Sequence, residues 1–116
     1  MAKELPFYRF SPAEWLTGKI TLENFEMQGI FILICCYYWK SNCDMTRTEL
    51  EKRLATKRAI FCLNSLINSK IIKFFPEKNK INIFFLDEQF EILTHIQEER
   101  KKAGRLGGVT KERNKH

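Results

Sequence analysis

The chain has 116 residues, of which 44% are hydrophobic, and a formal net charge of +6. This size fits one domain with a single core. The longest apolar run, residues 30–39, is half as long as the about 20 residues that a membrane-spanning helix needs. Residues 1–6 lack the apolar stretch of a signal peptide. We therefore expect a cytoplasmic, one-domain protein that does not bind a membrane.

The net positive charge lies at the C-terminus. Residues 1–99 contain 13 Lys or Arg and 13 Asp or Glu, whereas residues 100–116 contain seven basic residues and one acidic residue. Neutralisation of phosphates supplies most non-specific DNA affinity, so this tail is a candidate DNA-binding segment. A basic tail also serves as a solubilising or linking segment, and both interpretations stay open. The first 99 residues should bind DNA weakly unless their basic side chains gather on one face.

Cysteine and histidine spacing argues against a metal site. The thiols and imidazoles of the chain belong to Cys35, Cys36, Cys43, Cys62, His95 and His116. No two cysteines have the two-residue spacing of a zinc knuckle. We expect reduced thiols, three of them buried in apolar segments (residues 35, 36 and 62), and no metal or other cofactor.

An aromatic leader opens the chain at residues 5–20. Ser11 before Pro12 is typical of a helix start with proline at the first helical position, which predicts a short helix. We expect the rings of Phe7 and Phe10 to cover a sheet. Thr21 is then predicted to cap a second helix.

That second helix is predicted from Leu22 to about Lys40. Its second half, residues 30–39, is apolar all round, which is typical of a helix at the centre of a small domain. We therefore interpret its aromatic residues as core and not as a base-stacking platform. Gly29 in mid-helix suggests close packing against another element.

Two short capped helices are predicted next. Thr46 and Glu49 have the spacing of a capping box, in which each side chain bonds the other's backbone. Thr56 can cap a following helix whose apolar residues share one face up to residue 68. The two helices are separated by a single short turn.

A hairpin and a last helix complete the predicted fold. Residues 71–75 and 81–86 read as strands joined by a tight turn at 76–80. Asp87 is predicted to cap the last helix. The glycines at positions 104, 107 and 108 are predicted to end it, which leaves residues 104–116 as a flexible basic tail.

This order of elements predicts an α+β, mainly α, fold over residues 1–103. It is the order of a winged helix-turn-helix with a two-stranded or three-stranded antiparallel sheet and a long C-terminal helix. In that fold the third helix commonly enters the DNA major groove, and the hairpin contacts the backbone beside it.

Three motifs in order carry a family resemblance: the aromatic segment 7–16, ending in Glu14-Trp15-Leu16; the glycine-marked helix from Glu26 to Trp39; and an Ala-Gly-Arg-x-Gly-Gly tail at 103–108. With these motifs the chain resembles the N-terminal domain of phage-type replication initiators, also called replisome organisers. The resemblance implies a winged-helix domain that binds origin DNA. It also implies a helicase or helicase loader as partner, which members recruit through a second domain that follows a linker.

Candidate DNA contacts come from three segments. They are Lys57, Arg58, Phe61, Ser65 and Asn68 in the helix predicted after Thr56, Lys78, Asn79 and Lys80 in the hairpin turn, and Arg100, Lys101, Lys102 and Arg105 in the tail. Basic side chains bind phosphate or guanine, and Asn and Ser bind base edges. The alternatives are an ordinary wet helix face, with its phenylalanine covered by another element or a partner, and a charged turn that prevents edge aggregation.

Catalytic motifs are missing from the sequence. It has no glycine-rich phosphate loop between a strand and a helix and no Ser/His/Asp or Cys/His arrangement, so we expect no enzymatic activity. The leading hypothesis is the DNA-binding domain of a phage- or mobile-element-type replication initiator that binds duplex DNA. The alternatives are a protein-interaction module of a replication complex, which the neutral charge of residues 1–99 favours, and a small transcriptional regulator. The oligomeric state stays open.

Overall fold

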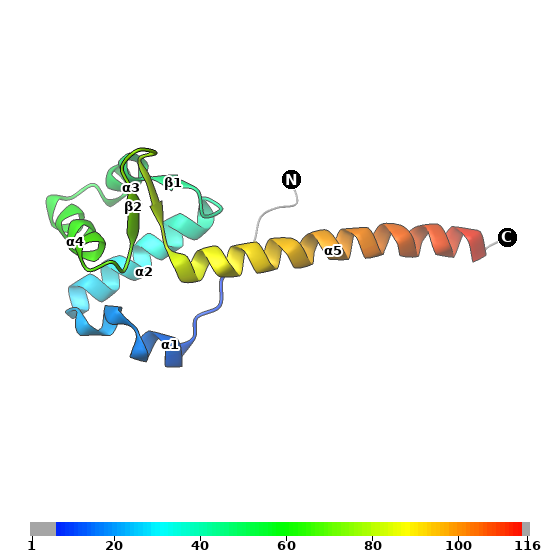
Figure 1. Cartoon of the computed structure of the whole chain (residues 1–116), viewed down its shortest axis with the longest axis horizontal. Coiled ribbons are helices and arrows are strands. Elements are labelled where there is room, and N and C mark those ends of the chain that lie inside the picture. The colour runs from blue at the N-terminus through cyan, green and yellow to red at the C-terminus, as the bar shows by residue number, and fades with distance from the viewer. Residues whose placement is uncertain (1–6, 115–116) are drawn as a thin grey trace.

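The computed structural model describes the backbone of residues 7–114 and the side chains of residues 7–104 (Figure 1). In chain order the elements are α1 (Pro12–Thr17), the 3-10 helix η1 (Lys19–Leu22), α2 (Phe25–Lys40), β1 (Met45–Thr46), α3 (Arg47–Leu54), α4 (Lys57–Asn68), β2 (Lys73–Phe75), β3 (Lys80–Asn82) and α5 (Phe84–Asn114). The fold is α+β and mainly helical. Within the described residues, no helix combines the length and the apolar character that crossing a membrane requires.

The sheet is small and has three antiparallel strands in the order β1-β3-β2. Ile81 of the central strand lies opposite Met45 on one side and Phe74 on the other. The first strand, β1, therefore lies between α2 and α3 in the sequence, and the hairpin after α4 supplies the other two strands. Of the two predicted sheet sizes, the three-stranded one is confirmed.

The core is built around α2. Ile34, Cys35 and Tyr38 of this helix have no exposed surface, and Leu63 and Leu66 of α4 are equally buried. Figure 1 shows α2 crossing behind the sheet, with α4 and α5 on opposite sides of it. The expectation that the aromatic end of α2 belongs to the core is confirmed for Tyr38 and Trp39, which are buried, whereas Tyr37 is half-buried.

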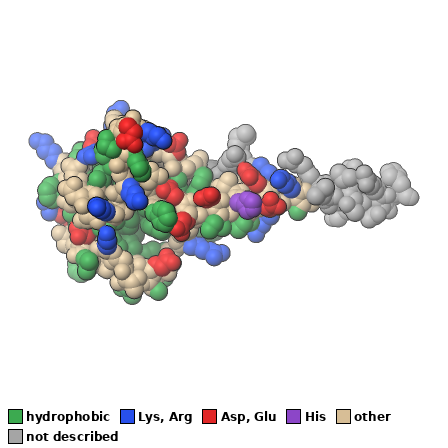
Figure 2. Space-filling view, viewed as in Figure 1, with side chains coloured by type: hydrophobic (Ala, Val, Ile, Leu, Met, Phe, Trp, Pro, Cys, Tyr) green, Lys and Arg blue, Asp and Glu red, His purple; other side chains and the backbone are tan. Residues whose placement is uncertain are grey.

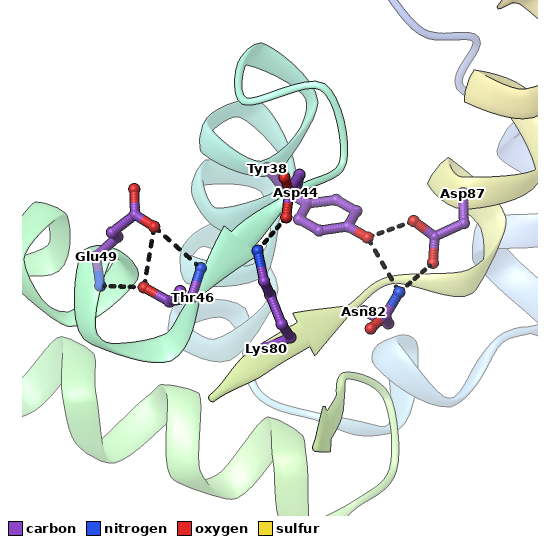
Figure 3. Close-up of polar contacts among 7 residues, drawn as sticks. All are labelled: Tyr38, Asp44, Thr46, Glu49, Lys80, Asn82 and Asp87. Atoms are coloured by element: carbon purple, nitrogen blue, oxygen red, sulfur yellow. Dashed lines mark hydrogen bonds and ion pairs between the residues drawn. The ribbon is translucent and has the colours of Figure 1, made fainter. Parts of the chain in front are cut away.

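Helix starts follow the predicted caps in three places. Ser11 accepts a hydrogen bond from the backbone of Glu14 at the start of α1. Thr46 and Glu49 form both bonds of the capping box, as Figure 3 shows. Thr56 accepts a bond from the backbone of Ala59. The local polar signals therefore located these three helices correctly.

The start of α2 differs from the prediction. Residues 19–22 form the 3-10 helix η1, and the N-cap of α2 is Asn24, which accepts from the backbone of Met27. The hydroxyl of Thr21 instead donates to the carbonyls of Leu16 and Gly18. Gly29 is exposed, and a Cβ there would meet no atom within 4 Å, so the expected close packing is also wrong.

The predicted second strand was too long. Residues 84–86 belong to α5, because the carbonyl of Ile83 accepts from the backbone of Leu86 at 3.1 Å and of Asp87 at 3.0 Å. Asp87 consequently lies in the first turn of α5 and is not its cap. Apolar residues that bury one helix face also satisfy a strand pattern over so short a run.

The glycines near the C-terminus do not end α5. The helix runs through positions 104, 107 and 108 to Asn114, and the last two residues lie outside the described part. A glycine cap requires a left-handed backbone, and no described glycine has a positive φ. The prediction that these glycines end the helix is therefore wrong, and the flexible tail at residues 104–116 stays a prediction.

The aromatic leader packs against α2 and α5 through Tyr8 and Trp15. The Tyr8 ring lies 5.6 Å from Trp39 and 6.3 Å from Phe85, centroid to centroid. Phe7 and Phe10 are 72% and 51% exposed, so the expectation that they cover the sheet is wrong.

Candidate nucleic-acid interface

One face of α4 is turned to solvent. Ala59, Cys62, Leu63 and Leu66 bury the opposite face against the core. This separation follows from the helical period, which brings every third or fourth residue to the same side. The helix is therefore held on its apolar side and leaves a continuous polar side free for a ligand.

The five candidate residues of α4 lie on this solvent side. They are Lys57, Arg58, Phe61, Ser65 and Asn68, of which only Ser65 is half-buried and the other four are exposed. The Phe61 side chain is 56% exposed, so within the described residues no other element covers it. Their common placement is confirmed, and contact with DNA stays a prediction.

Arg58 is engaged by an acidic residue of α2. Its Nε lies 2.9 and 3.0 Å from the two carboxylate oxygens of Glu26, and its Nη2 lies 2.5 Å from one of them. These hydrogen bonds from Arg58 lower the pKa of Glu26. The guanidinium carbon also lies 5.5 Å from the centre of the Phe61 ring. A phosphate that binds Arg58 must therefore compete with a carboxylate.

Arg47 holds three elements together. Its Nε donates to Glu51 of α3 at 3.1 Å, and its Nη2 donates to the side chain of Asn64 on α4. Its guanidinium also lies over the Phe74 ring of β2, at 4.9 Å from the centroid. Arg47 thus fixes α4 relative to the sheet and is not an ordinary solvated arginine.

The hairpin turn is tied to the start of α3. Asn79 has a left-handed backbone with φ of 53°. Its side-chain amide donates to the hydroxyl of Thr48 at 2.8 Å, and its carbonyl accepts from the backbone of Arg47 at 2.8 Å. The turn therefore has a fixed position beside the helix pair.

Only part of the positive charge of the turn is free. Lys80 forms an ion pair with Asp44 (Figure 3). Lys78 is exposed at the tip and has no ion pair among the described residues. Of the three turn residues predicted to contact DNA, Lys78 alone offers an unpaired cation.

The remaining candidates lie on α5, away from the body of the domain. Arg100, Lys101 and Lys102 are exposed and form no ion pair within the described side chains. Figure 2 shows acidic and basic side chains along this part of the helix. The side chain of Arg105 lies outside the described residues. The most basic segment of the chain, which begins at Arg100, therefore lies away from α4 (Figure 1).

An apolar groove was not predicted. It has a volume of about 470 Å³ and is lined by Trp15 of α1, Phe31 of α2, and Phe84 and Phe85 of α5, among others. Phe84 is 66% exposed at its rim. The aromatic residues of the leader were the sequence signal from which this groove could have been predicted. The groove forms only where the leader contacts the start of α5, and these segments are about 70 residues apart in sequence.

A partly buried polar cluster connects α2, β3 and α5 (Figure 3). The Tyr38 hydroxyl donates to one carboxylate oxygen of Asp87, and the Asn82 amide donates to the other at 3.1 Å. Burial, followed by this bond to Asp87, raises the pKa of Tyr38. The cluster satisfies a hydroxyl that is cut off from water, which is a structural role.

Thiol burial differs from the prediction at one position. Cys35 and Cys62 are buried as expected, but Cys36 is exposed. Within the described residues, no three His, Cys, Asp or Glu side chains are placed to hold a metal ion.

Comparison of the chain with protein-family models, with curated proteins and with solved structures found no match. No relative therefore supplies a functional site that can be transferred to these residues. The function has to be inferred from the chain's own geometry.

Proposed function

We propose that this chain is a winged-helix domain that binds duplex DNA as part of a phage-type replication initiator. The observation that carries the proposal is the solvent-exposed polar face of α4, which follows the capped helix α3 after one short turn. Residues able to bind phosphate and base edges lie together there. A cytoplasmic location belongs to the proposal.

The sheet topology supports the winged-helix assignment. In the proposed scheme α2, α3 and α4 are the three helices, and β2 and β3 form the wing. The short strand β1 lies between the first two helices and pairs with β3. The bonds from Asn79 place the wing next to the start of α3, as a backbone contact beside the recognition helix requires.

Charge placement assigns unequal roles to the candidate residues. Lys57 and Lys78 are exposed and unpaired among the described residues, whereas Arg58 and Lys80 are held by carboxylates. We propose that the first two contact phosphates directly. The basic residues of α5 supply further non-specific affinity.

The test is fluorescence anisotropy of labelled duplex DNA at several salt concentrations. Lys57→Ala should weaken binding and lower the slope of log affinity against log salt by about 0.9 for one lost phosphate contact. Lys40→Ala removes an exposed lysine at the end of α2 and is the matched control. Equal effects of both substitutions would refute a specific role for α4.

The apolar groove favours a second candidate function, docking of a protein partner. Grooves lined by apolar and aromatic side chains are typical binding sites, and the exposed ring of Phe84 lies at this one. A helicase or helicase loader is the partner implied by the family resemblance. Binding of purified helicase and loader should weaken in Phe84→Ser, with Phe61→Ser, on α4, as control.

A further inference from the structure

The C-terminal helix carries an apolar face that no part of the described chain covers. Ile92 and Ile96 lie one turn apart on α5 and are 58% and 39% exposed. Residues 90 and 93 of the same helix pack against the core on another face. One helical turn after Ile96, the same side reaches Glu99 and then Ala103 by the helical period. The first part of α5 therefore has two faces, of which one is used.

The charges of α5 are divided into two blocks. Residues 87–99, the acidic half, contain five Asp or Glu and no Lys or Arg. Residues 100–113, the basic half, contain six Lys or Arg and one Glu. The change of sign falls between Glu99 and Arg100, near the midpoint of the helix.

We propose that α5 pairs with α5 of a second copy of the chain in antiparallel orientation. In this arrangement the acidic half of each copy lies along the basic half of the other, so opposite charges meet over the whole contact. A parallel pair would place like charges side by side, which is unfavourable. Charge complementarity therefore favours a second copy of the chain as the partner of this face, and it favours the antiparallel orientation over the parallel one.

The register follows from the point where the charge changes sign. A two-fold axis between Glu99 and Arg100 places Ile96 opposite Ala103 of the other copy. A small residue opposite a branched one lets the two helices approach closely. The same axis brings Glu98 within reach of the other copy's Lys102. The apolar contact and this ion pair can therefore form in the same register.

A helix that is polar on most sides and lacks a partner is only marginally stable in water. Within one copy, the Glu98–Lys102 spacing and the order of acidic before basic residues support the helix weakly. Burial of Ile92 and Ile96 against a second copy adds the hydrophobic contribution that is missing. DNA is a poorer occupant of this face, because the acidic half would repel it.

Sedimentation velocity of the full chain from low to high micromolar concentration tests the pairing. We expect a concentration-dependent dimer that dissociates in Ile92→Glu/Ile96→Glu. Leu22→Glu is the control, since Leu22 is 83% exposed on η1. A wild-type monomer throughout, a dimer lost in the control instead, or association only with DNA would overturn the proposal.

A charge exchange makes the test independent of the apolar substitutions. A variant with Glu88, Glu91 and Glu98 changed to Lys should be monomeric, as should one with Lys101, Lys102 and Arg105 changed to Glu. Their mixture should form a dimer, because each now complements the other. A mixture that stays monomeric would overturn the proposal.

Cross-linking tests for the contact between two copies. A carbodiimide joins carboxylates to amines, and mixing isotopically light and heavy copies identifies links between copies. The expected links connect Glu98 or Glu99 of one copy to Lys101 or Lys102 of the other. If links occur only within single copies, the antiparallel contact does not exist.

Discussion

Glu26 on α2 binds the guanidinium of Arg58 on α4 through both of its carboxylate oxygens. The pair joins two helices that are 32 residues apart in sequence, and it lies on the surface, where both side chains are largely exposed. It places a negative charge beside the face of α4 that we propose for DNA. Glu26 is thus positioned to limit the contribution of Arg58 to binding.

Removal of this carboxylate should strengthen DNA binding. Glu26→Gln keeps the side-chain shape but frees Arg58 for phosphate. Because an exposed ion pair is weak and is screened by salt, affinity should rise by a factor of at most about five. Anisotropy titrations of the two proteins at one salt concentration measure the change.

A control variant separates the loss of the ion pair from the change in net charge. Glu14→Gln removes an exposed carboxylate from α1 and should leave affinity nearly unchanged. The double variant Glu26→Gln/Arg58→Ala should lose the gain. If Glu14→Gln strengthens binding as much as Glu26→Gln does, the effect is one of net charge and not of the ion pair.

Sequence signals predicted the helices that polar caps define. The hydroxyls of Ser11, Thr46 and Thr56 each bond the backbone three residues ahead, and such bonds depend only on neighbouring residues. The turn at 76–80 was predicted for the same reason. Local chemistry therefore determined the starts of α1, α3 and α4.

The sequence could not predict features that depend on distant contacts. Phe84 and Phe85 satisfy a strand pattern, and only their packing against α1 and α2 places them in a helix. The third strand, β1, exists because Ile81 lies opposite Met45. Contacts between residues so far apart in sequence leave no pattern of apolar and polar residues in the short segments that form them.

For the candidate site, the sequence predicted which residues of α4 are exposed but not which of them form ion pairs with distant residues. Helical spacing placed Lys57 and Phe61 on the exposed face of α4 correctly. It gave no information on the carboxylates that neutralise Arg58 and Lys80, since Glu26 and Asp44 lie 32 and 36 residues away. The net charge of a helix face depends on its neighbours in space.

Cys36 should be the fast-reacting thiol. It is exposed, whereas Cys35 and Cys62 are buried. Burial raises the pKa of Cys43 to about 12, and its thiol donates to the carbonyl of Leu86. Since the thiolate is the reactive form, the folded protein should show one fast and three slow thiols with Ellman's reagent at about pH 8.

The variant Cys36→Ser should abolish the fast phase and leave the slow phases unchanged. A fast phase that persists in this variant would show that a second thiol is accessible, which contradicts the described packing. Reaction in urea, where all thiols are exposed, provides the total count.

Asp87 should stabilise the fold by accepting hydrogen bonds from the buried Tyr38 hydroxyl and the half-buried Asn82 amide. Asp87→Ala leaves the Tyr38 hydroxyl without its acceptor, and an unsatisfied buried polar group costs about 1–3 kcal/mol. The neighbouring Glu88 of α5 is exposed, so Glu88→Ala removes a carboxylate of the same charge without this cost. Urea unfolding followed by circular dichroism compares the two variants.

A double-mutant cycle separates the bond from the rest of the site. If Tyr38 and Asp87 interact as described, the loss in Tyr38→Phe/Asp87→Ala is smaller than the sum of the two single losses. Additive losses would mean that the contact contributes nothing to the free energy of unfolding.

Stability should fall at alkaline pH. Burial raises the pKa of Tyr8 to about 12, and burial together with the bond to Asp87 raises that of Tyr38 further. A raised pKa in the folded state gives stability that is complete below the unfolded value, about 10 for tyrosine, and is lost as pH rises above it. Buried thiols extend the effect down to about pH 8.5, where cysteine ionises in the unfolded chain.

Urea unfolding in reducing buffer between about pH 8 and about pH 11 measures this dependence. The free energy of unfolding should decline steadily over that range, and Tyr38→Phe should decline less steeply than the wild type because one titrating group is gone. Tyr37 is less buried than Tyr38, so Tyr37→Phe is the matched control for the loss of a tyrosine hydroxyl. Identical slopes in the wild type and Tyr38→Phe would show that the Tyr38 hydroxyl ionises equally in the folded and unfolded chains, contrary to its burial against Asp87.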